Sequence, residues 1–98
     1  MAYPAGPDEL IQLLTPEGGR VEHPDFSFGD GLSAEEEAEQ IRGFYRDMVL
    51  TRRLDVEATA LQRHGELGLW AQLLGQEAAQ IGAGRALLPQ DFVFPTYR

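Results

Sequence analysis

The feature that most constrains this fold is a long stretch of helix-forming residues without a proline. It begins at Ser33-Ala34-Glu35-Glu36, a capping box in which the serine hydroxyl caps the amide three residues on and Glu36 reaches back. It ends at Gly65, because glycine readily adopts the left-handed conformation that stops many helices. At about 1.5 Å per residue, the predicted helix is on the order of 45 Å long, more than a small domain covers by itself.

The predicted helix carries apolar residues on two opposite faces. Placed at about 100° per residue, one face contains Ile41, Phe44, Tyr45, Met48, Val49 and Val56. The opposite face contains Leu50, Leu54, Ala58 and Leu61. A surface helix of a small monomer has one apolar stripe, so we expect both faces to be covered. Gly43, inside the helix, costs up to about 1 kcal/mol relative to alanine and indicates a close contact there.

The end of the chain predicts a second helix followed by a strand. The helix is expected from Gly75 to Leu88, where Pro89 stops it. Small residues recur along it at every fourth position, which indicates tight packing in a core or an interface; they are Ala78, Gly82 and Ala86. The apolar residues 92–94 are expected to form a strand that leads to the last residues of the chain.

The beginning of the chain predicts a short hairpin. Residues 10–14 and 20–22 flank Thr15-Pro16-Glu17-Gly18-Gly19, which has proline and glycine at turn positions. A one-turn helix over residues 8–14 is the alternative interpretation.

The rest of the first part is expected to be irregular. Residues 1–9 are rich in proline and glycine and are predicted to be disordered. Phe26 and Phe28 are spaced to place both rings on one side of an extended loop, so we expect them to pack on another part of the protein. We therefore divide the chain into an acidic N-terminal arm with a short hairpin, residues 1–32, and a helical part, residues 33–98.

Acidic residues are concentrated in the first part of the chain. The formal net charge is -8, and residues 1–40 carry ten acids against Arg20 alone. Affinity for nucleic acid depends on neutralising phosphates with basic side chains, so no nucleic-acid partner is expected. No apolar run is long enough to span a bilayer, so no membrane partner is expected. The start of the chain lacks the basic and apolar segments of a secretory signal, which predicts a cytoplasmic protein.

Tyr97 and Arg98 are the residues to which we assign a binding role. The guanidinium of arginine presents a planar fork of donors matched to phosphate oxygens, so a strand ending at this pair is typical of the edge of a phosphate site. We expect the rest of such a site to lie outside these 98 residues. We therefore interpret the chain as the first part of a larger protein. Cysteine and lysine are absent, which excludes thiolate and Schiff-base chemistry within it.

Other polar residues receive structural interpretations, and no residue is assigned a catalytic role. Arg52 and Arg53 are predicted to pair with Asp55, with Glu57 or with a partner subunit. Residues 75–77, Gly-Gln-Glu, either offer amides to an anion or allow close packing at the start of the second helix. Both interpretations stay open.

Four segments in order resemble one family. They are residues 45–55, Tyr-Arg-Asp-Met-Val-Leu-Thr-Arg-Arg-Leu-Asp; residues 61–68, Leu-Gln-Arg-His-Gly-Glu-Leu-Gly; residues 75–78, Gly-Gln-Glu-Ala; and residues 94–98, Phe-Pro-Thr-Tyr-Arg. Together they closely resemble the N-terminal part of the alpha subunit of the decarboxylating component of 2-oxo acid dehydrogenase complexes. This family includes the pyruvate and branched-chain 2-oxo acid dehydrogenases.

The resemblance implies a fold, a reaction and partners. The chain is expected to be the mainly helical N-terminal segment of an α/β fold that binds thiamine diphosphate. The complete enzyme is expected to pair two alpha with two beta subunits, to decarboxylate a 2-oxo acid and to pass the acyl group to a lipoyl-bearing acyltransferase. Tyr97 and Arg98 match a Tyr-Arg pair that contacts the cofactor's diphosphate in this family, and Thr96 matches a position that lines the active site in some members.

The chain also departs from the family pattern. In the family, the Gly-Asp-Gly that holds magnesium lies after the Tyr-Arg pair, so magnesium ligands are expected outside this chain. Residues 29–31 are also Gly-Asp-Gly, but the chain contains no asparagine to complete such a site, and we interpret them as a turn. The chain alone is therefore predicted to be inactive.

The substrate and an alternative function remain open. Ala71 occupies a position where some pyruvate-specific members have histidine, but members of both specificities lack it, and we favour pyruvate over branched-chain 2-oxo acids. The alternative function is a small acidic helical module that binds other proteins without a cofactor.

Overall fold

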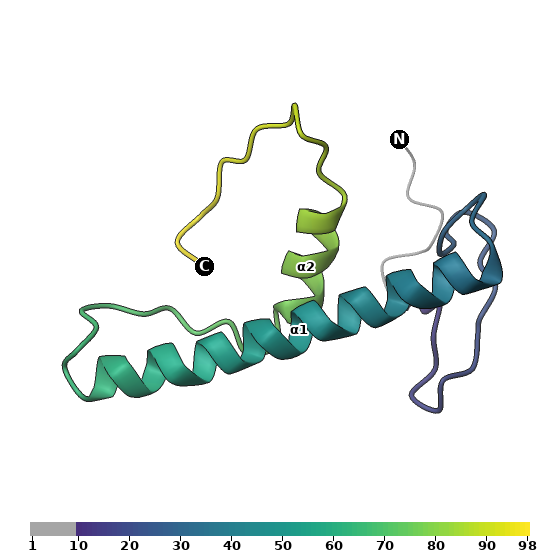
Figure 1. Ribbon diagram of the computed structural model, residues 1–98. Helices are drawn as coiled ribbons and strands as arrows, with labels where there is room; N and C mark the ends of the chain where they lie inside the picture. Colours follow the sequence, from purple (N-terminus) through teal and green to yellow (C-terminus); the bar gives the residue numbers. More distant parts are fainter. Residues whose placement is uncertain (1–9) are drawn as a thin grey trace. The chain divides into compact units, whose positions relative to one another are not determined.

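The computed structural model describes residues 10–98, and within them it contains two helices and no strand (Figure 1). Helix α1 spans Ala34–Arg63 and helix α2 spans Glu77–Arg85. The prediction that the chain is mainly helical is confirmed. The predicted disorder of residues 1–9 lies outside the described residues. The chain divides into two compact units between Ala38 and Glu39.

Both predicted ends of α1 are confirmed. At the start, the Ser33 amide donates to Glu36 Oε2 at 2.7 Å and the Glu36 amide donates to Ser33 Oγ at 3.2 Å, the two bonds of a capping box. At the end, Gly65 has a φ of 78°. The Glu66 amide donates to the Leu61 carbonyl at 2.9 Å and the Gly65 amide to the Gln62 carbonyl at 3.1 Å. This Schellman pattern turns the chain back at the residue that the sequence indicated.

Helix α2 is shorter than the predicted span of 75–88. Gly75 has a φ of 87°, outside the helical region, and its amide donates to the side chain of Glu77 at 2.9 Å, so the helix begins two residues later. At the other end, the Leu88 amide donates to Asp91 Oδ2 at 2.7 Å and the Asp91 amide donates to the Leu88 carbonyl at 3.0 Å. This turn contains Pro89 and takes the chain out of the helix before Leu88.

The predicted strand over residues 92–94 is wrong. No pairing partner exists for it within the described part of the chain, and a strand requires a neighbour to accept its backbone hydrogen bonds. Phe94 is 92% exposed and Phe92 is 86% exposed.

In the first unit, the predicted hairpin is reduced to one antiparallel bridge between Leu14 and Arg20. The turn that joins them is closed by the Thr15 amide donating to the Gly19 carbonyl at 2.8 Å and by the Gly18 amide donating to the Thr15 carbonyl at 3.0 Å. Residues 10–14 are not helical, so the described part of the alternative one-turn helix is wrong.

The two phenylalanines of this unit pack on polar side chains. The guanidinium of Arg20 lies 5.3 Å from the centre of the Phe28 ring, and Arg20 also pairs with Glu37. The Phe26 ring lies 5.2 Å from the His23 ring at a tilt of 45°. The expected packing of both rings is therefore local.

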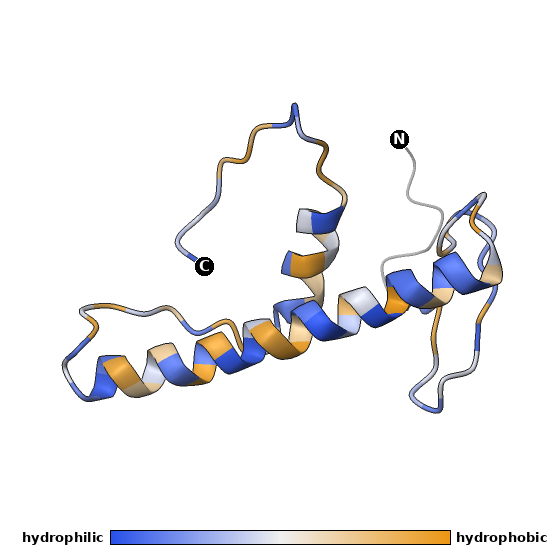
Figure 2. Cartoon of the chain, in the orientation of Figure 1, coloured by the Kyte–Doolittle hydropathy of each residue, from blue (hydrophilic) through white to orange (hydrophobic). Residues whose placement is uncertain are grey.

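Much of the apolar surface of α1 is exposed. Figure 2 shows apolar residues in orange recurring between hydrophilic residues in blue along the helix. The exposed apolar residues of α1 come from both predicted faces; they are Tyr45, Val49, Leu50, Leu54, Val56 and Leu61. Only Gly43, Asp55 and Ala58 of α1 are buried. The expectation that both faces are covered is not met within residues 10–98. No described helix is both long and apolar enough to cross a membrane.

Candidate functional site

Of the three predicted site residues, the structure brings two together. The Thr96 hydroxyl donates to the carbonyl of Arg98 at 3.1 Å, and both residues line an open cavity of about 600 Å³ together with Leu73 and Ala83. Tyr97 is not among the lining residues, and its side chain is 90% exposed. Thr96 and Arg98 therefore face a common cavity, whereas Tyr97 is exposed outside it.

Arg98 is held by the loop that joins the two helices. Its Nε donates to the backbone carbonyl of Gln72 at 2.8 Å. Within residues 10–98, Arg98 forms no ion pair with an acidic side chain, and its two Nη groups make no hydrogen bond. A guanidinium carries five N–H donors, so four of them remain available on the Nη edge.

The loop itself is fastened to α1 by Asp55, whose residue surface is only 5% exposed. Oδ1 of Asp55 accepts the indole Nε1–H of Trp70 at 2.9 Å and the amide of Leu73 at 2.8 Å. These bonds, first the one from the Leu73 amide and then the one from Trp70, lower the pKa of the Asp55 carboxyl below its usual value. Asp55 is therefore an ionised group held in a nearly closed environment.

A second buried carboxylate, Glu77, stands at the start of α2 and is 4% exposed. Its Oε1 accepts Arg52 Nε at 2.9 Å and its Oε2 accepts the Gly75 amide at 2.9 Å. The hydrogen bond from Arg52 is the main cause that lowers the pKa of Glu77. The Gly75 amide is thus already bonded to a carboxylate, which favours the packing interpretation of residues 75–77 over anion binding.

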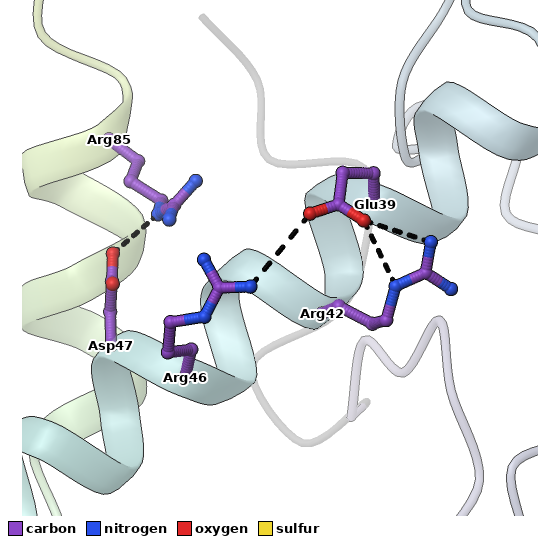
Figure 3. A network of polar contacts seen from close by, with 5 residues as sticks. All are labelled: Glu39, Arg42, Arg46, Asp47 and Arg85. Carbon is purple, nitrogen blue, oxygen red and sulfur yellow. Dashed lines mark hydrogen bonds and ion pairs between the residues drawn. The ribbon is translucent and has the colours of Figure 1, made fainter.

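Arginines of α1 and α2 form further ion pairs with acidic side chains. Arg53 pairs with Glu57 at 2.6 Å, as one of the predicted alternatives, whereas Arg52 pairs with Glu77 and not with the nearer acids in sequence. Arg85 Nε donates to Asp47 Oδ2 at 2.7 Å, and Glu39 is bonded to Arg42 and lies 3.9 Å from Arg46. Figure 3 shows these contacts as dashed lines.

Arg85 also explains the buried glycine of α1. A Cβ added at Gly43 would lie 2.8 Å from Arg85 Nη2 and 2.9 Å from Nη1. The guanidinium carbon of Arg85 lies 5.3 Å from the centre of the Phe44 ring. The close contact predicted at Gly43 is confirmed, and its partner is a charged side chain of α2.

The Gly-Asp-Gly of residues 29–31 has turn geometry. Gly29 and Gly31 have φ angles of 62° and 82°, and the carboxylate of Asp30 accepts the hydroxyl of Ser27. Residues 10–98 contain no group of three or more histidine, aspartate or glutamate side chains arranged to hold a metal ion.

The roles of Asp55, Trp70 and Glu77 could not be read from the sequence. A pattern search links residues a few positions apart in one element, whereas Asp55 and Trp70 are separated by fifteen residues and a reversal of the chain. The one available signal was that Asp55 shares a helical face with Phe44 and Met48, because a charge beside apolar side chains needs a partner when it is buried.

Comparisons with known proteins connect these residues to one family. Residues 45–98 match the family described as dehydrogenase E1 component. The chain is 52% identical over 94 residues to the 3-methyl-2-oxobutanoate dehydrogenase subunit alpha of Mycobacterium tuberculosis. The matched region covers 92% of this chain and 23% of that protein. It is 36% identical over 90 residues to the pyruvate dehydrogenase E1 component subunit alpha of Bacillus cereus, covering 92% of this chain and 22% of that protein.

A third relative, the pyruvate dehydrogenase E1 component subunit alpha of Bacillus subtilis, is 47% identical over 60 residues, covering 61% of this chain and 16% of that protein. The chain thus spans less than a quarter of the length of these three relatives. No solved structure matches it.

Proposed function

Because the chain belongs to the dehydrogenase E1 component family, we propose that it is the N-terminal part of the alpha subunit of an enzyme that decarboxylates a 2-oxo acid with thiamine diphosphate. The observation that carries the proposal is Arg98, whose Nη edge makes no hydrogen bond within residues 10–98 while its Nε is held by the Gln72 carbonyl. In the complete subunit, residues 33–98 belong to an α/β domain that binds the cofactor, and residues 1–32 form a separate acidic arm.

The donors at this end of the chain fit a diphosphate. Two parallel N–H bonds from one guanidinium match two oxygens of a phosphate group. With Nε already bonded, Arg98 offers the two Nη groups, which both lie at the tip of the side chain. Thr96 lines the same cavity as Arg98, with its hydroxyl donating to the Arg98 carbonyl at 3.1 Å, and Tyr97 keeps an exposed hydroxyl outside that cavity.

When bound, thiamine diphosphate supplies the electron sink that allows a 2-oxo acid to lose carbon dioxide. The residues of this chain bind and orient its phosphate end. Their contribution is electrostatic. The fixed positive charge of Arg98 stabilises the negative charge of the diphosphate, which loses water when it binds. Magnesium ligands are expected in the rest of the subunit.

The proposed assembly has two alpha and two beta subunits and delivers its acyl group to a lipoyl-bearing acyltransferase in the cytoplasm. The names of the relatives support the alpha-subunit assignment, since all three are alpha subunits of 2-oxo acid dehydrogenases. The exposed apolar faces of α1 agree with a chain whose covering surfaces lie in the rest of the subunit and in its partners.

Two substrates enter the proposal. The sequence favoured pyruvate, whereas the higher identity to a 3-methyl-2-oxobutanoate dehydrogenase subunit alpha favours a branched-chain 2-oxo acid. The ratio of the two kcat/KM values, measured with one preparation of the complete enzyme, decides between them.

The cofactor assignment is tested with Arg98→Ala in the complete alpha subunit assembled with its beta subunit. We expect the thiamine diphosphate concentration for half-maximal release of carbon dioxide to rise at least about tenfold, because a charge-assisted pair of hydrogen bonds is lost. Arg98→Lys keeps the charge without the planar fork and is expected to give a smaller rise.

Arg53→Ala is the matched control, because Arg53 is a surface arginine paired only with Glu57 in the described residues. It is expected to leave the cofactor requirement unchanged. If Arg98→Ala also leaves it unchanged, the diphosphate assignment fails, and the protein-binding module becomes the favoured function.

A further inference from the structure

We propose that Asp55 is a positioning residue for Arg98 and acts through the peptide unit that joins Gln72 to Leu73. This inference rests on the proposed function of Arg98 and names the group that sets its orientation. It concerns a buried carboxylate that has no direct contact with the proposed ligand.

The two hydrogen bonds meet in one peptide plane. The Leu73 N–H donates to Asp55 Oδ1 at 2.8 Å, and the Gln72 carbonyl of the same peptide bond accepts Arg98 Nε at 2.8 Å. A trans peptide is planar, with its N–H and C=O pointing in opposite directions. When Asp55 fixes the direction of the N–H, it therefore also fixes the direction of the carbonyl that holds Arg98.

Charge strengthens the same chain of contacts. A carboxylate that accepts an N–H polarises the peptide unit, and the carbonyl at its other end becomes a better acceptor for a cation. The Leu73 amide is the largest cause that lowers the pKa of Asp55, and the guanidinium of Arg98 adds a smaller effect in the same direction. The Asp55 carboxylate, the dipole of the peptide unit and the Arg98 guanidinium therefore lie in a row. The negative charge strengthens the hydrogen bond that the carbonyl accepts from the guanidinium.

Trp70 keeps this arrangement in place. Its indole N–H donates to the same oxygen of Asp55 at 2.9 Å, so one oxygen holds the loop at Trp70 and at Leu73. The loop cannot rotate about a single contact, because two donors fifteen and eighteen residues away from Asp55 converge there. The side chain of Asp55 therefore determines where the Gln72 carbonyl lies.

The arrangement also selects how Arg98 binds. Because Nε is occupied by the Gln72 carbonyl, the two-point contact that uses Nε and one Nη is excluded. The remaining contact uses both Nη groups at the end of the side chain. Loss of Asp55 would release the carbonyl and free the guanidinium to rotate, which weakens binding of a diphosphate without removing any donor.

The test uses the complete alpha and beta subunits freed of cofactor and titrated calorimetrically with thiamine diphosphate and magnesium. Asp55→Leu removes both acceptor oxygens, and we expect its Kd to rise about tenfold, with kcat at saturating cofactor close to that of the wild type. Asp55→Asn keeps an oxygen that accepts both bonds but removes the charge, and is expected to give a smaller rise. A role limited to stability would lower the active fraction and leave the Kd unchanged.

Glu77→Gln is the matched control, because Glu77 is an equally buried carboxylate that also holds one amide and one side chain. The amide that Glu77 accepts, that of Gly75, is not part of the peptide unit that holds Arg98. The Kd is therefore expected to stay at the wild-type value. If Asp55→Leu does not assemble, Trp70→Phe, which removes one of the two donors to Asp55, carries the test and is expected to raise the Kd.

An unchanged Kd in Asp55→Leu, or in Trp70→Phe where that variant carries the test, overturns the inference, as does an equal rise in Glu77→Gln. Arg98→Ala, titrated in parallel, distinguishes the proposed binding role of Arg98 from the proposed positioning role of Asp55. If Arg98→Ala raises the Kd and Asp55→Leu does not, only the positioning role fails; if Arg98→Ala has no effect, the proposed function fails with it.

Discussion

Asp55 and Glu77 make the folding stability of the second unit depend on pH in the acidic range. Both carboxyls have a lowered pKa in the folded chain, Asp55 chiefly through the Leu73 amide and Glu77 chiefly through Arg52. Their unfolded-state pKa values are the ordinary ones of about 4. The folded state is therefore favoured above about pH 4, and this stabilisation is lost as the pH falls through the lower folded-state values.

The acid dependence is measured by the midpoint of urea unfolding of the complete alpha subunit between about pH 6 and about pH 3. We expect the wild type to lose stability more steeply below about pH 4 than Asp55→Asn, which cannot titrate at that position. Arg53→Ala serves as the control and should keep the wild-type slope. Parallel curves for the wild type and Asp55→Asn would contradict the assignment of a lowered pKa to Asp55.

At the scale of single residues, the sequence predicted those features that depend on near neighbours. Ser33 and Glu36 form the expected capping box because both partners lie within one helical turn. The burial of Gly43 was also predictable, since a glycine inside a helix has a cost that a close contact offsets. The identity of its partner, Arg85, was not predictable, because it depends on where α2 crosses α1.

At the scale of elements, α2 is joined to α1 at Gly43 and Asp47 through the side chain of Arg85. Replacement of Gly43 by alanine improves helix propensity by up to about 1 kcal/mol but places a methyl group against the guanidinium. The guanidinium is the end of a flexible side chain and can move aside, but moving it disturbs its bond to Asp47, so we expect the single substitution to gain less than the full propensity difference.

We expect the full gain to appear when Arg85 is absent. In an Arg85→Ala background, Gly43→Ala should stabilise the complete alpha subunit by roughly the propensity difference of 1 kcal/mol, so that the double-mutant cycle shows a coupling of about 0.5 kcal/mol or more. Denaturant unfolding measures the four free energies. Ala34→Gly, at the first residue of α1 and away from this contact, should show no coupling to Arg85→Ala.

The elements that were predicted wrongly from the sequence are those whose bounds depend on hydrogen-bond partners outside the element. Residues 92–94 have the composition of a strand, but no described segment pairs with them. Helix α2 lost residues at both ends because Gly75 and the turn after Leu87 satisfy their amides with side chains of Glu77 and Asp91. Composition predicts a preference, whereas the available hydrogen-bond partners determine the outcome.

At the scale of the whole chain, apolar side chains are numerous and little buried. Ala58 is the one buried apolar side chain in the described residues, and none of the large side chains there is fully enclosed. Contiguous exposed apolar surface promotes association. The family assignment and the small share of its relatives that the chain spans agree with this surface being an interior one in the complete protein.

We therefore expect the 98-residue chain, produced alone, to bind a hydrophobic dye strongly and to self-associate. The complete alpha and beta subunits should show little dye fluorescence per alpha chain. Dye titration together with light scattering provides the measurement. A monomeric chain with low dye fluorescence and a cooperative melting curve would instead support the protein-binding module.

Residues that come later after α1 contact residues that come earlier in α1. This order bears on how the unit folds. Trp70 and Leu73 reach Asp55, Glu77 reaches Arg52 and Arg85 reaches Asp47, over separations of 15, 18, 25 and 38 residues. The entropy lost on closing a loop grows with its length, so the Asp55 contacts close most readily and each one shortens the loop left for the next. We therefore expect assembly to proceed from the turn at Gly65 toward the start of α1, so that loss of Asp55 delays the later contacts and loss of Asp47 leaves the earlier ones unchanged.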